Sequence, residues 1–144
     1  RRWAAFVPHE AVTARVRPEE LTGRLAPRDL PVFRALMLLA GLPLPTWAAA
    51  WGPGGSAGFE LATGHPAVRA DSDLDLVIRA PEPVPAPEVA RLLATLTELP
   101  VRVDVQLQCP RGGFAAAEYA RGGPEVLLRT DEGPFLVADP WEAR

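Results

Sequence analysis

The sequence predicts an α/β domain of the α+β kind, with a mixed sheet flanked by helices. Segments with helical spacing of apolar residues are interspersed with segments of alternating polarity. Turns rich in proline or glycine separate them. The chain has 144 residues, of which 48% are hydrophobic, so it is long enough to bury one core. Helices packed on a sheet are the architecture that this order of elements favours.

Apolar residues at three- and four-residue spacing predict the helices. In residues 29–40 this stripe precedes Gly41 and Pro43, which end the helix, and in residues 88–99 it forms one apolar face. The helix at 29–40 is expected to bury Leu30, Phe33, Leu36, Met37 and Ala40. In all, helices are predicted at residues 18–25, 29–40, 57–64, 88–99 and 112–120.

Alternating polarity and turn residues predict the strands at residues 46–51, 71–79, 101–108, 125–130 and 134–137. Residues 131–133, Asp-Glu-Gly, suit a hairpin turn between the last two. We expect residues 1–45 to be an N-terminal helical segment, the end of a truncated N-terminal region. Residues 46–144 are then expected to form a catalytic domain.

Charge and composition exclude several classes of protein. The net charge of -3 does not suit a general nucleic-acid binder. All 15 basic residues are arginine, whose forked donors suit phosphate recognition. The single cysteine, Cys109, allows neither an internal disulfide nor a cysteine-based zinc site. No apolar stretch is long enough to span a bilayer and no secretory signal is visible, so we expect a cytoplasmic protein without membrane partners.

A glycine-rich turn followed by an acidic strand is the most informative part of the chain. Gly54, Gly55 and Ser56 form a turn whose backbone N–H groups can approach a phosphate. Alternation in the strand places Asp73 and Asp75 on one face, roughly 7 Å apart. Two neighbouring carboxylates repel each other unless a cation neutralises them, and Mg²⁺ prefers such hard oxygen ligands. These features predict metal-assisted phosphoryl or nucleotidyl transfer.

A third acid, Asp104, lies on the polar face of the strand at 101–108. If that strand lies beside the acidic one, Asp73, Asp75 and Asp104 converge and can hold two divalent ions, Mg²⁺ or alternatively Mn²⁺. The alternative is that both polar faces are simply solvated. Arg69 and Arg79 flank the acidic strand and are candidates to bind substrate phosphates. His9 and His65 lie next to prolines without a patterned acid partner, so a Ser-His-Asp triad has little support.

These motifs resemble a known family. The GGS turn, the SDLDL strand and the later VDVQ strand are similar to the nucleotidyltransferase fold typified by DNA polymerase β. More narrowly, WGPGGSAGFELATG, SDLDLVIRAP, RVDVQLQCPRGGFAAAEYAR and LLRTDEGPFLVADPW resemble the malonate decarboxylase holo-acyl-carrier-protein synthases, also called phosphoribosyl-dephospho-CoA transferases. The resemblance covers residues 47–141.

The resemblance implies a specific activity and specific roles. Such enzymes transfer 2'-(5''-phosphoribosyl)-3'-dephospho-CoA from its triphosphate precursor to a serine of the malonate decarboxylase acyl carrier protein, and they release pyrophosphate. Asp73 and Asp75 would be the metal-binding pair, Asp104 the third acid, and Gly55 with Ser56 the triphosphate cradle. Two alternatives stay open: a minimal nucleotidyltransferase that uses an ordinary nucleoside triphosphate, and a non-catalytic module that docks on a carrier subunit.

Overall fold

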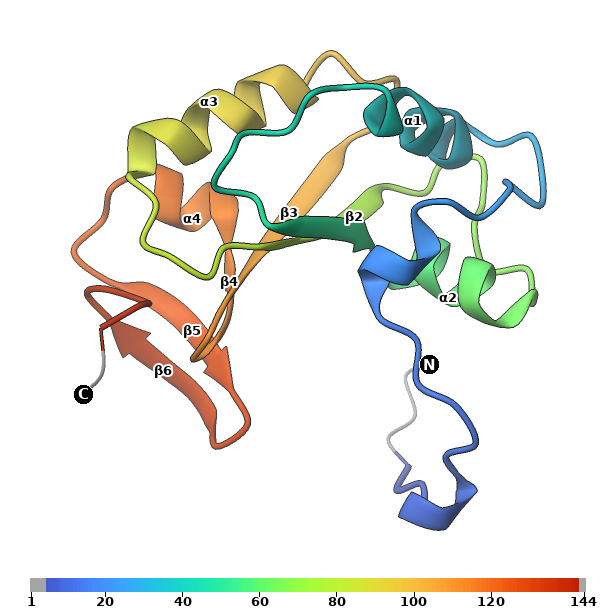
Figure 1. Ribbon diagram of the computed structural model, residues 1–144, viewed down its shortest axis with the longest axis horizontal. Helices are drawn as coiled ribbons and strands as arrows, with labels where there is room; N and C mark the ends of the chain where they lie inside the picture. The colour runs from blue at the N-terminus through green and yellow to red at the C-terminus, as the bar shows by residue number, and fades with distance from the viewer. Residues whose placement is uncertain (1–4, 143–144) are drawn as a thin grey trace.

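A six-stranded sheet organises the structure, a computed structural model that describes residues 5–142 (Figure 1). The strands lie side by side in chain order. β2 and β3 are parallel, and the other neighbouring pairs are antiparallel. The strands are β1 (Ala50–Pro53), β2 (Leu74–Arg79), β3 (Val103–Cys109), β4 (Gly112–Ala115), β5 (Val126–Thr130) and β6 (Gly133–Val137). The predicted mixed α/β fold is therefore confirmed.

In residues 5–142, four α-helices accompany the sheet: α1 (Pro31–Ala40), α2 (Gly55–Thr63), α3 (Ala86–Leu96) and α4 (Ala116–Ala120). Two short 3-10 turns precede them, η1 (His9–Ala11) and η2 (Pro18–Leu21). Pro31 begins α1, where its missing N–H costs no helical hydrogen bond. Gly64 ends α2 in the left-handed conformation, with φ of 76°. None of the helices in residues 5–142 is long and apolar enough to cross a membrane.

The two faces of the sheet have different roles. Alternation directs the apolar side chains of the strands to one face, where Leu74, Leu76, Ile78, Val105, Leu107, Phe114 and Leu128 are buried. Residues of α1, α3 and α4 belong to the same core, and these helices lie together on one side of the sheet (Figure 1). The other face carries polar side chains of β2, β3 and β5.

Residues before the sheet pack closely on its first strand. A Cβ at Gly52 of β1 would lie 1.9 Å from the carbonyl oxygen of Pro18, so only glycine allows η2 to approach this strand. A Cβ at Gly58 of α2 would lie 2.6 Å from the carbonyl oxygen of Pro53. The division of the chain at residue 45 stays a prediction, and residues 1–4 and 143–144, the ends of its two ranges, lie outside the described residues.

Three predicted elements need correction. The prediction of one helix over residues 112–120 is wrong, because Gly112–Ala115 pairs with β3 as β4 and only Ala116–Ala120 is helical. The helix at 18–25 is limited to the turn η2, and Leu25 is exposed. The buried face of α1 consists of Val32, Phe33, Ala35 and Leu39, so the expected burial of Met37 and Ala40 is wrong.

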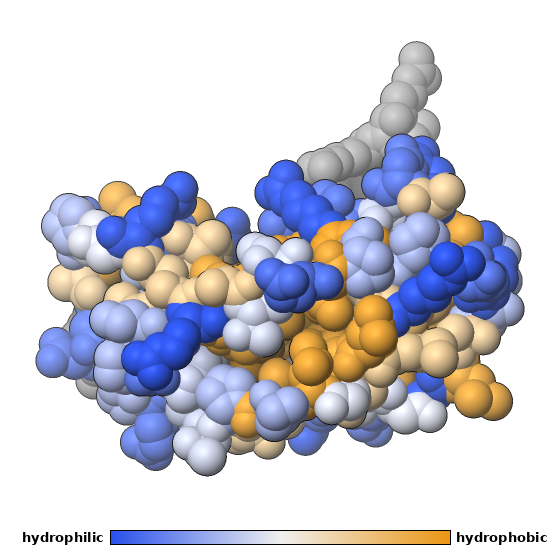
Figure 2. Space-filling model, turned by 90° about the horizontal axis from the view of Figure 1, so that it is seen from above, coloured by the Kyte–Doolittle hydropathy of each residue, from blue (hydrophilic) through white to orange (hydrophobic). Residues whose placement is uncertain are grey.

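The face of α1 that is turned away from the core carries exposed apolar side chains. Met37 and Leu38 of α1, and Leu42 just after it, are exposed. Figure 2 looks onto the side of the molecule that carries α1 and α3, and it shows hydrophobic residues gathered among hydrophilic ones. Periodicity alone did not identify the buried stripe, because apolar residues occur nearly all the way around this helix.

Candidate active site

A cavity of about 440 Å³ opens on the polar face of the sheet. It extends from the turn before α2, across β2 and β3, to β5. Its lining comprises Gly54, Gly55, Asp75, Leu76, Val77, Asp104, Val105, Gln106, Ala115 and Arg129. Four of the residues predicted for the site therefore line one cavity: Gly54, Gly55, Asp75 and Asp104.

The parallel pairing of β2 and β3 brings two predicted carboxylates together. Asp75 and Asp104 are register partners, so their backbones lie one strand spacing apart, about 4.8 Å. Asp73 immediately precedes β2 and is exposed. Burial raises the pKa of Asp75, and the negative charges of Asp104 and Asp73 raise it further. The charges of both neighbouring acids therefore act on Asp75.

The glycine turn packs directly on Asp75. The Gly54 N–H donates a hydrogen bond of 2.8 Å to the Asp75 carbonyl oxygen. Gly55 has a φ of 52°, and a Cβ there would lie 1.9 Å from Asp75 Oδ2. Two constraints therefore favour glycine at this position: the left-handed backbone and the space that the carboxylate occupies.

Replacing Gly55 by alanine is expected to displace the Asp75 carboxylate and to weaken Mg²⁺ binding by about 10-fold or more. The reason is that the new methyl group and the side chain of Asp75 compete for the same space. Isothermal titration of Mg²⁺ measures the effect. Gly64→Ala is the matched control, because φ there is also positive, at 76°, but nothing lies within 4 Å of a Cβ. Equal Mg²⁺ affinity of the two variants would contradict the prediction.

The donor groups of the cavity suit a hard divalent cation. Asp75 and Asp104 supply carboxylate oxygens from adjacent strands, and the pKa of Asp75 is raised first by burial and then by the charges of Asp104 and Asp73. Asp104 forms an ion pair of 3.1 Å with Arg102, an exposed neighbour on the same segment. Across residues 5–142, no three Asp, Glu, His or Cys side chains are gathered closely enough to hold a metal ion as they stand. The metal site of Asp73, Asp75 and Asp104 stays a prediction.

Three other predicted binding residues are not part of the cavity lining. Ser56 is the second residue of α2 and is half-buried. Arg69 is largely exposed and pairs with Asp71 at 3.3 Å. Arg79, at the far end of β2 from Asp75, pairs with Glu19 at 3.3 Å. The roles of these residues in phosphate binding stay predictions.

Two polar residues of the cavity lining, Gln106 and Arg129, were not predicted as site residues. Gln106 shares the polar face of β3 with Asp104. Strand alternation therefore predicts the face on which its side chain lies, but not that the residue lines the cavity. Arg129 belongs to β5, two strands beyond β3. No motif marks Arg129 in the sequence, because its place in the cavity depends on the pairing of β3, β4 and β5.

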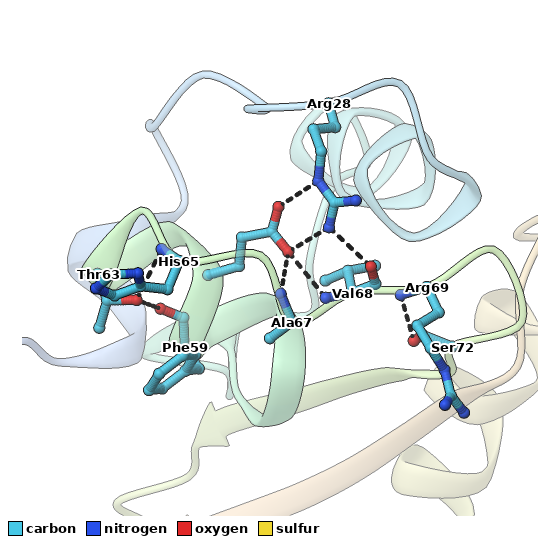
Figure 3. A network of polar contacts seen from close by, with 9 residues as sticks. Arg28, Phe59, Thr63, His65, Ala67, Val68, Arg69 and Ser72 are labelled. Carbon is cyan, nitrogen blue, oxygen red and sulfur yellow. Dashed lines mark hydrogen bonds and ion pairs between the residues drawn. The ribbon is translucent and has the colours of Figure 1, made fainter.

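An ion pair between a buried carboxylate of α2 and a partly exposed arginine was also not predicted. Glu60 of α2 is 2% exposed and accepts hydrogen bonds from Arg28 Nε at 2.8 Å and Arg28 Nη2 at 2.7 Å (Figure 3). The N–H groups of Ala67 and Val68 donate to the same carboxylate, each at 2.8 Å. The Arg28 hydrogen bonds are the main cause that lowers the pKa of Glu60 to about 2. This network ties α2 to the segment that leads into the acidic strand.

The mixed sheet, the glycine turn and the acids in one cavity are consistent with a nucleotidyltransferase-like fold. The family model described as the C-terminal domain of phosphoribosyl-dephospho-CoA transferase MdcG matches residues 20–140, and the chain belongs to this family. The family named from the sequence motifs is therefore confirmed.

Curated relatives support the same assignment. A protein from Pseudomonas aeruginosa named phosphoribosyl-dephospho-CoA transferase is 48% identical over 143 residues, which cover 97% of this chain and 67% of that protein. Proteins of the same name from Pseudomonas fluorescens and Azotobacter vinelandii are 41% and 39% identical, and each alignment covers 97% of this chain and 68% of the relative. No solved structure matches the chain.

Proposed function

We propose that this chain transfers the 2'-(5''-phosphoribosyl)-3'-dephospho-CoA group from its triphosphate precursor to a serine of the malonate decarboxylase acyl carrier protein. The observation that carries the proposal is the position of Asp75 and Asp104, in register beneath the glycine turn and in one cavity. Membership of the transferase family and the name of its relatives supply the substrate class.

The acids would hold Mg²⁺, with Mn²⁺ as the alternative. The charges of Asp104 and Asp73 both act on Asp75, so these three carboxylates are the groups that would bind the cation. When bound, the cation supplies charge neutralisation for the α-phosphate and the leaving pyrophosphate. The N–H group of Gly55 at the start of α2, with the Ser56 hydroxyl, would bind the phosphates that leave, while Gly54 fixes the turn through its hydrogen bond to Asp75.

A residue of this chain can accept the proton that the carrier serine loses. The carrier serine Oγ attacks the α-phosphorus, a new P–O bond forms, and the bond from the α-phosphorus to the oxygen bridging to the β-phosphorus breaks. Pyrophosphate leaves with that electron pair. Asp104 would accept the serine proton, since its side chain is 48% exposed and within reach of an incoming protein. Arg102 pairs with Asp104 at 3.1 Å and would orient its carboxylate.

A transfer assay tests the proposal. Purified protein, precursor, Mg²⁺ and apo carrier protein are mixed, and the intact mass of the carrier is measured. The expected result is a mass increase equal to the transferred group, with release of pyrophosphate. An ordinary nucleoside triphosphate in place of the precursor is expected to leave the carrier unmodified. Modification from the nucleoside triphosphate, or none from the precursor, would contradict the proposal.

A further inference from the structure

Arg129 lines the active-site cavity at the end away from the glycine turn. Its strand β5 lies three strands beyond β2 in the sheet, roughly 14 Å at about 4.8 Å per strand. Within residues 5–142, its guanidinium forms neither an ion pair nor a side-chain hydrogen bond. Arg102, the arginine beside Asp104, is by contrast paired with that acid. Arg129 is therefore a positive charge in the cavity lining that has no partner among the described residues.

The part of the cavity lining between Asp104 and Arg129 is polar. One residue of β4 there has no side chain, which leaves space for two glutamine amides. A Cβ at Gly113 would lie 2.2 Å from Gln106 Nε2 and 3.0 Å from Gln108 Oε1. Gly113 is also the register partner of Arg129. The two glutamine amides therefore occupy the space above β4, and Gln106 contributes a hydrogen-bond donor to the cavity lining.

We propose that Arg129 and Gln106 form a second anion subsite, which binds the diphosphate inside the dephospho-CoA part of the donor. This inference rests on the proposed function. The precursor carries two polyphosphate groups, namely the triphosphate on its outer ribose and the diphosphate that joins adenosine to pantetheine. Two ribose rings separate these groups, so a cavity that binds both needs positive charge or hydrogen-bond donors at both ends.

Such a subsite would select the donor. An ordinary nucleoside triphosphate has a single polyphosphate group, which the glycine turn and the cation can bind without Arg129. The guanidinium fork of arginine matches two phosphate oxygens at once, and lysine would offer only a point charge. Arg129 would therefore contribute to donor specificity, because it binds only a donor whose internal diphosphate reaches β5.

Two probes separate the two ends of the cavity. Dephospho-CoA carries the internal diphosphate without the triphosphate, and Mg²⁺-tripolyphosphate represents the triphosphate alone. Arg129→Gln is expected to weaken the binding of dephospho-CoA by about 10-fold or more, measured by isothermal titration. It is expected to leave the binding of Mg²⁺-tripolyphosphate within about twofold of the wild type. Arg129→Lys is expected to restore part of the loss.

Arg121→Gln is the matched control, because Arg121 is an exposed arginine at the end of α4, outside the cavity lining. Unchanged binding of dephospho-CoA by Arg129→Gln, an equal loss with both probes, or no binding by the wild type would overturn the inference. Its failure is distinct from that of the proposed function. A carrier left unmodified alongside Arg129-dependent binding of dephospho-CoA contradicts only the function. A modified carrier with an Arg129-independent KM for the precursor contradicts only the subsite.

Discussion

Asp75→Asn is expected to lower the rate of carrier modification by about 10³-fold, ~4 kcal/mol of transition-state stabilisation. Asp75 is the acid at the centre of the cavity, with Gly55 against it and Asp104 beside it in register. Asparagine keeps the size of the side chain and removes its charge. The variant is therefore expected to lose Mg²⁺ affinity as well as transfer, and both are measured on the same preparation.

The same substitution should not destabilise the metal-free fold. Burial and the neighbouring acids raise the pKa of Asp75, so the folded state disfavours its charge more than the unfolded state does. The ionised group costs stability once the pH rises above its ordinary pKa, and the uncharged asparagine side chain removes that cost. We therefore expect the Tm of the metal-free variant to equal or exceed that of the wild type. Added Mg²⁺ should raise the Tm of the wild type alone.

Asp71→Asn provides the control for charge in this segment. Asp71 is an exposed acid four residues before Asp75 that pairs with Arg69, and it does not line the cavity. This variant is expected to modify the carrier at close to the wild-type rate. If Asp75→Asn retained transfer within a few-fold, the proposed role of Asp75 would be wrong. A large fall in its Tm would indicate a structural role instead.

Local patterns predicted the parts of the fold that depend on local physics. The alternation around Asp75 and Asp104 correctly placed both acids on polar faces, because the neighbouring leucines and valines must enter the core. The prediction of one helix over residues 112–120 is wrong, since alanine-rich sequence favours helix while β4 exists through its pairing with β3.

The unpredicted features of the site all depend on contacts between distant residues. Arg129 enters the cavity only because β4 and β5 follow β3 in the sheet. Glu60 occurs in a short helix with no neighbouring cation in sequence, and its partner Arg28 lies 32 residues earlier. A sequence without an alignment gives no sign of such pairs.

Glu60→Gln is expected to destabilise the protein by about 1.5 to 3 kcal/mol, because the buried side chain of Glu60 loses its charge-assisted hydrogen bonds from Arg28, while the 39% exposed Arg28 stays partly solvated. Chemical denaturation in urea at pH 7 measures the effect. Glu98→Gln is the control, since Glu98 is an exposed acid after α3 outside this network. A difference of less than about 1 kcal/mol between the two variants would show that the ion pair is not a major source of stability.

The pH dependence of stability gives a second and independent test. The pKa of Glu60 falls from its ordinary 4.5 to about 2 in the folded protein, first because of the Arg28 hydrogen bonds and then because of the Val68 and Ala67 N–H groups. A group with a lowered folded pKa stabilises fully above its unfolded pKa and loses this contribution as the pH falls toward the folded value. The wild type should therefore lose stability between about pH 4.5 and pH 2, and Glu60→Gln should lose less over that range. Because the network joins α2 to the segment before Asp73, the same acid step is expected to loosen the glycine turn from the acids.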